Sequence, residues 1–78
     1  MQAEKLARMA NQIATAFAHL PAARAAERVA GHIRDFWDPR MRAGLARIAA
    51  EQPEILSPTV VEASRQLETA AGTGPSPQ

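Results

Sequence analysis

The chain turns a corner at Phe36-Trp37-Asp38-Pro39, within the segment Gly31-His32-Ile33-Arg34-Asp35-Phe36-Trp37-Asp38-Pro39-Arg40-Met41-Arg42. Pro39 disfavours the helical conformation at Asp38 and has no backbone N–H. It therefore suits the first position of a new helix, with Asp38 as the N-cap. Successive helical residues point about 100° apart, so we expect one of Phe36 and Trp37 to enter the core and the other to face outward. This corner is the first candidate for a contact surface.

Helical periodicity extends from the corner in both directions. Apolar spacing predicts one helix over residues 2–19 and a second from about Ala22 to Phe36. After the corner, a third helix is expected from Pro39 to about Ala50, and Ser57-Pro58 opens a short fourth helix that ends near Ala70. The expected apolar stripes are Leu6, Met9, Ala10, Ile13, Phe17 and Leu20; Ala22, Ala26, Val29, Ile33 and Phe36; Met41, Leu45 and Ile48; and Val60, Ala63, Ser64 and Leu67.

These segments predict an all-α fold, a small bundle of three main helices plus a short C-terminal helix and a disordered tail. The helical domain is expected to span residues 1–70 and the tail residues 71–78, which contain no apolar side chain larger than Ala. The third stripe carries Gly44 beside it. Gly31 lies inside the second helix, where glycine costs roughly 1 kcal/mol against alanine, so we expect something to pack closely over it.

The length and composition of the chain limit the classes of function that it can have. A chain of 78 residues forms at most one small domain, and domains of this size commonly depend on a disulfide, a metal or a partner chain for stability. The sequence has no cysteine, so a partner chain is the remaining expectation. The net charge of +1 predicts no strong field for nucleic acid or anionic lipid. No apolar run approaches the length of a membrane span, and the N-terminal residues have no signal-peptide layout.

Residues with catalytic or metal-binding potential are sparse. The two histidines, His19 and His32, lie in separate predicted helices without the spacing of a metal motif, so no metal site is predicted. Ser57 and Ser64 lack a supporting base motif, no pair of carboxylates stands out, and no glycine-rich phosphate loop occurs. We therefore expect no catalytic and no cofactor-binding residues in this chain.

The arginines near the corner allow three interpretations. Together with Trp and Met they have the composition of a protein–protein interface. They are also compatible with phosphate contacts in a helix-turn-helix module or with an ordinary solvated surface. Trp37 has two interpretations as well, an interface anchor or a lid over Ile33 and Met41 in the core. The arginines are Arg34, Arg40, Arg42 and Arg47, and the nearby acidic residues that offset them are Asp35, Asp38, Glu51 and Glu54.

Two blocks of sequence, Met9-Ala10-Asn11-Gln12-Ile13-Ala14 and His32 to Arg42, resemble the small delta subunit of bacterial NAD-dependent, molybdenum-containing formate dehydrogenase. Leu56-Ser57-Pro58-Thr59-Val60, followed by Ala63 and Leu67, is similar to the C-terminal part of that family. The resemblance covers roughly residues 5–67. It departs at Phe17-Ala18-His19, where a second bulky aromatic residue is expected beside Phe17.

The resemblance implies a place in a cytoplasmic complex that oxidises formate at a molybdenum centre held by a bis-pterin cofactor. Electrons would then pass through iron–sulfur clusters to FMN and NAD. The delta chain would hold none of these cofactors and would act as an accessory subunit that binds the catalytic alpha subunit. The alternatives are a transient chaperone for insertion of the molybdenum cofactor and a small helical DNA-binding regulator, against which the near-neutral charge speaks. A homodimer in isolation is compatible with each of them.

On this interpretation, Trp37 and Met41 supply apolar anchor area, and Arg40 and Arg42 donate hydrogen bonds to carboxylates or carbonyls of the alpha subunit. Asn11 and Gln12 would extend the contact from the first helix. The full predicted partner-binding set is Asn11, Gln12, His32, Trp37, Asp38, Arg40, Met41 and Arg42.

Overall fold

The computed structural model describes the backbone of residues 3–73 and the side chains of residues 3–68. All regular elements in this range are helical, which confirms the predicted all-α class. The elements are α1 (Ala3–Ala16), α2 (Ala22–Phe36), α3 (Pro39–Glu51), a single 3₁₀ turn η1 (Pro53–Ile55) and α4 (Pro58–Thr73).

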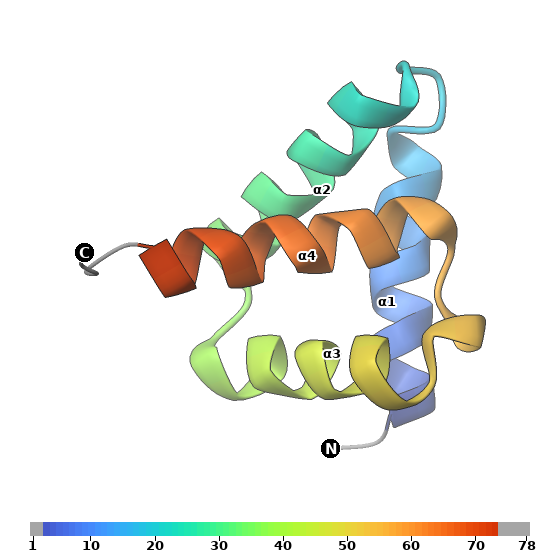
Figure 1. Ribbon diagram of the computed structural model, residues 1–78. Coiled ribbons are helices and arrows are strands. Elements are labelled where there is room, and N and C mark those ends of the chain that lie inside the picture. Colours follow the sequence, from blue (N-terminus) through green and yellow to red (C-terminus); the bar gives the residue numbers. More distant parts are fainter. Residues whose placement is uncertain (1–2, 74–78) are drawn as a thin grey trace.

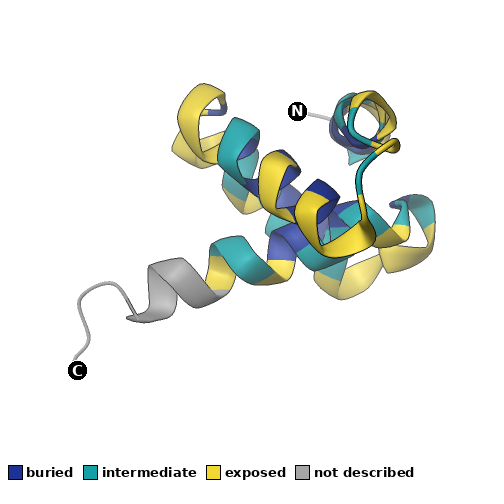
Figure 2. Cartoon of the chain, turned by 90° about the horizontal axis from the view of Figure 1, so that it is seen from above, coloured by how far each residue is buried: buried dark blue, intermediate teal, exposed yellow. Residues whose placement is uncertain are grey.

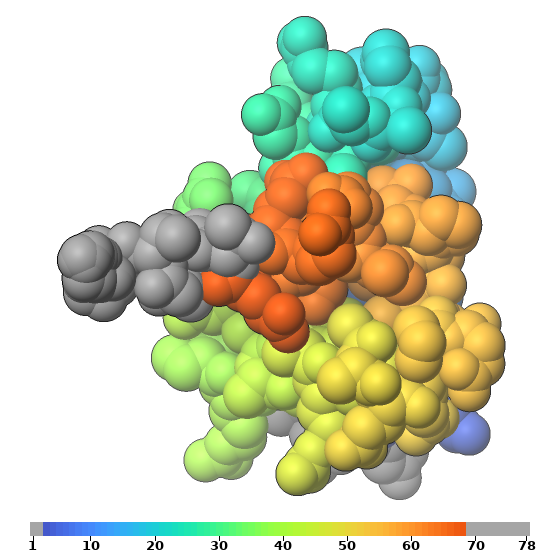
Figure 3. Space-filling model, in the orientation of Figure 1, coloured from blue at the N-terminus to red at the C-terminus, as the bar shows by residue number. Residues whose placement is uncertain are grey.

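The four α-helices pack in two crossing pairs (Figure 1). α1 and α2 diverge from the turn that joins them, whereas α3 and α4 run across them in opposite directions. α4 packs most extensively against α2, and α1 packs mainly against α3. In the space-filling view, α4 lies between α2 and α3 on the face turned to the reader (Figure 3).

The helix boundaries follow the sequence signals with two differences. α1 ends at Ala16 rather than near residue 19, because the chain tightens there into bonds between residues three apart, beginning with Phe17 N donating to Ala14 O at 3.1 Å. α4 is longer than expected, since it spans 16 residues and reaches Thr73. Of the predicted tail, residues 71–73 therefore belong to α4, and residues 74–78 lie outside the described residues.

Small side chains fill most of the interface between α1 and its neighbours. Ala7, Ala10 and Ala14 are buried on α1, and a Cβ added at Gly44 of α3 would lie only 2.6 Å from Leu6 Cδ1. Glycine at this position therefore allows α3 to approach α1 closely. Figure 2 shows the buried positions on the sides of the helices that face one another. The largest fully buried side chains are Val29, Ile33, Leu45 and Val60.

The predicted apolar stripes identify the centre of the core correctly, but the stripe of α2 includes residues at both ends of the helix that are exposed. Val29 and Ile33 are fully buried, as is Leu45 of α3, and Ile48 of α3 is buried too. Ala22 and Phe36, the first and last residues of α2, are exposed although helical periodicity places them on the buried face. The core stops short of both ends of this helix.

The corner separates its two aromatic side chains as expected. Trp37 is 6% exposed and belongs to the core cluster that contains Ile33, whereas Phe36 is 74% exposed. Trp37 has left the helix: its backbone is extended (φ −94°, ψ 139°), and its N–H donates to Ile33 O. Asp38 Oδ1 accepts a hydrogen bond from Met41 N at 2.8 Å, which confirms the predicted N-cap. The core interpretation of Trp37 is therefore correct, and its side chain retains almost no surface for a partner.

Replacing Trp37 by Ala is expected to lower the free energy of unfolding by about 3–5 kcal/mol, because it removes the largest aromatic group from a small core. Urea unfolding followed by circular dichroism measures this change. Phe36→Ala serves as the matched control at the neighbouring exposed position and is expected to stay within about 0.5 kcal/mol of the parent chain. Equal stability of the two variants would contradict the assignment.

Candidate partner-binding surface

The structure distributes the eight predicted partner-binding residues over three places. Asn11 and Gln12 lie on α1, beside a hollow that also involves Ile55. His32 lies on α2 and lines a second hollow. The other five occupy the corner and the first turn of α3; they are Trp37, Asp38, Arg40, Met41 and Arg42. Several of these residues already have a structural role inside the chain.

Asn11 clamps the segment between η1 and α4 onto α1. Its Nδ2 donates to Ile55 O at 3.0 Å, and its Oδ1 accepts from Ser57 N at 2.9 Å. Ser57 Oγ in turn accepts from Val60 N at 3.3 Å in the first turn of α4. Both ends of the Asn11 amide are thus engaged within the chain. Asn11 therefore has a role inside the chain, and Gln12 beside it is exposed; the contact of both residues with a partner stays a prediction.

The predicted partner-binding residues in the first turn of α3 differ in how far their side chains are exposed. Arg40 is exposed, and Met41 is half-buried against the core cluster. Arg42 is also half-buried, and its Nε is enclosed without a hydrogen-bond partner among residues 3–68. It lines a hollow between α3 and α4 together with Leu67 and Glu68. Arg40, Met41 and Arg42 thus each keep some side-chain surface, and their contact with a partner stays a prediction.

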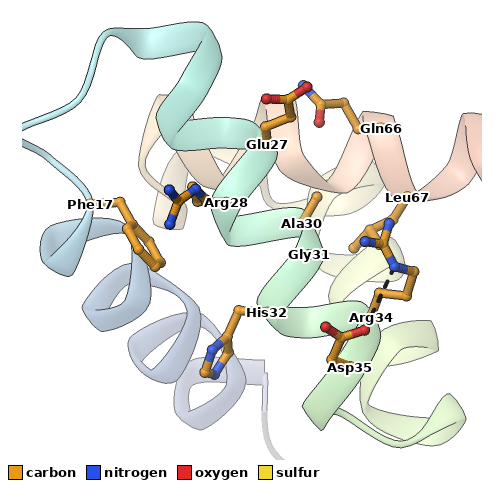
Figure 4. Close-up of a pocket in the computed structure, with 10 residues that line it drawn as sticks. All are labelled: Phe17, Glu27, Arg28, Ala30, Gly31, His32, Arg34, Asp35, Gln66 and Leu67. Carbon is orange, nitrogen blue, oxygen red and sulfur yellow. Dashed lines mark ion pairs between the residues drawn. The ribbon is translucent and has the colours of Figure 1, made fainter.

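Sequence reasoning missed an aromatic and cationic surface on α2. Phe36 is the exposed large apolar side chain of the described region, and its ring packs against His32 with the ring centroids 4.8 Å apart. Nearer the start of α2, Arg28 Cζ lies 5.9 Å from the centroid of the Phe17 ring. Figure 4 shows Phe17, Arg28 and His32 on one side of α2. Helical spacing indicates that positions 28 and 32 share a face, but nothing in the spacing shows that the core ends before Phe36.

Gly31 is one of the residues that line the hollow on α2. The other lining residues come from the turn after α1, from α2 and from α4, with Phe17 on one side and Gln66 and Leu67 on the other (Figure 4). A Cβ added at Gly31 would meet only Arg34 Nη2, at 3.5 Å, which is an ordinary contact with a long side chain. The close packing expected over Gly31 is therefore not provided by the described part of the chain.

The ion pairs of the described residues lie at the surface. Arg34 Nε is 3.8 Å from Asp35 Oδ1, Arg47 Nε is 3.8 Å from Glu51 Oε2, and Arg65 Nε is 3.2 Å from Glu62 Oε1. Pairs this exposed contribute little to stability. Across the same part of the chain, no three His, Cys, Asp or Glu side chains gather as a metal site would require, and no helix has the length and apolar character needed to cross a membrane.

The fold and surface define a small all-α protein in which, among residues 3–68, the ion pairs and the Phe36 ring lie at the surface. Residues 5–64 match the family model described as NADH-dependent formate dehydrogenase delta subunit FdsD, and the chain belongs to this family. The comparisons with curated proteins and with solved structures gave no match. The family match confirms the resemblance carried by the two sequence blocks.

Replacing Asn11 by Ala is expected to destabilise the chain by roughly 2 kcal/mol, because it leaves Ile55 O and Ser57 N without their part-buried partner. In the Asn11→Ala variant, amide hydrogen exchange should become faster than in the parent chain, and this increase should be larger in η1 and the first turn of α4 than in α2. Gln12→Ala, the exposed neighbour, is the control and should leave both quantities unchanged. If Asn11→Ala has the same stability and exchange rates as Gln12→Ala, the two hydrogen bonds of Asn11 do not stabilise the chain.

Proposed function

We propose that this chain is a non-catalytic accessory subunit that binds the catalytic alpha subunit of an NADH-dependent formate dehydrogenase. The observation that supports this proposal is the family match over residues 5–64, which includes the whole of α2, α3 and η1. A formate dehydrogenase delta subunit belongs with the other subunits of its complex. The proposal adds the choice of the alpha subunit as the direct partner.

In this proposal the chain contributes binding surface, and the other subunits hold the molybdenum bis-pterin centre, the iron–sulfur clusters, FMN and the NAD site. Exposed arginine and aromatic side chains suit such a role, because these residue types are enriched at protein interfaces. Arg40 provides a planar group with several N–H donors at the start of α3, and Met41 adds an adaptable apolar contact beside it.

The decisive experiment is co-purification of the full tagged chain from cells that express the whole complex. Subunit masses, stoichiometry and metal content are then measured. A fixed ratio of this chain to a molybdenum- and iron-containing, formate-oxidising complex is the expected result. Recovery with only a molybdenum-free alpha subunit would replace the proposal with a transient chaperone for cofactor insertion. Recovery of the chain alone, or with DNA, would overturn it.

Replacing Arg40 by Ala is expected to weaken binding to the alpha subunit by at least about tenfold, because truncation removes several directed donors from the contact. Binding is measured by titration calorimetry with the purified alpha subunit. The matched control is Arg47→Ala on the same helix, whose side chain is 79% exposed and pairs only with Glu51 among residues 3–68. Equal affinities for the two variants would remove Arg40 from the interface.

A further inference from the structure

We draw no further inference here: the strongest candidate, the exposed Phe36 ring that packs against His32 at the end of α2, is a surface patch, and nothing in the structure shows what covers it.

Discussion

One side-chain amide fixes the relative position of the first and last helices. Asn11 satisfies a backbone acceptor and a backbone donor on either side of Leu56, more than 40 residues further along the chain. The connection after α3 is thereby held against α1, and α4 begins where it can cross α2 and α3. Because Leu67 of α4 forms one side of the hollow over Gly31, the shape of that surface depends on an interaction at the other end of α4.

The second constraint is the small size of the buried side chains. Alanines on α1 and α2 and the glycine at position 44 have small side chains or none, so the helices can approach one another closely. Trp37 is the exception: its large indole is buried at the point where the chain leaves α2 and the backbone becomes extended. The Asp38-Pro39 pair that follows starts α3.

Local signals account for what the sequence predicts well. Proline preceded by a capping residue identifies the starts of α3 and α4, and apolar spacing locates the core centre at positions such as Ile33 and Leu45. The side chains whose surroundings were predicted wrongly depend on tertiary contacts. Periodicity counts Phe36 as buried because it cannot show where a neighbouring helix stops. Asn11 reads as a surface amide because the backbone groups that it binds become its neighbours only when η1 folds back. The Arg28–Phe17 contact likewise depends on the angle between α1 and α2.

The alanine-rich core also shapes how stability changes with temperature. Unfolding exposes less apolar surface per buried residue when that residue is alanine than when it is leucine or phenylalanine, and the heat capacity change of unfolding follows the apolar surface exposed. The stability curve of this chain is therefore expected to be shallow. A chain of this kind varies little in intrinsic stability across the growth range of a cell, so any partner that binds only the folded form becomes the larger influence on its folded population.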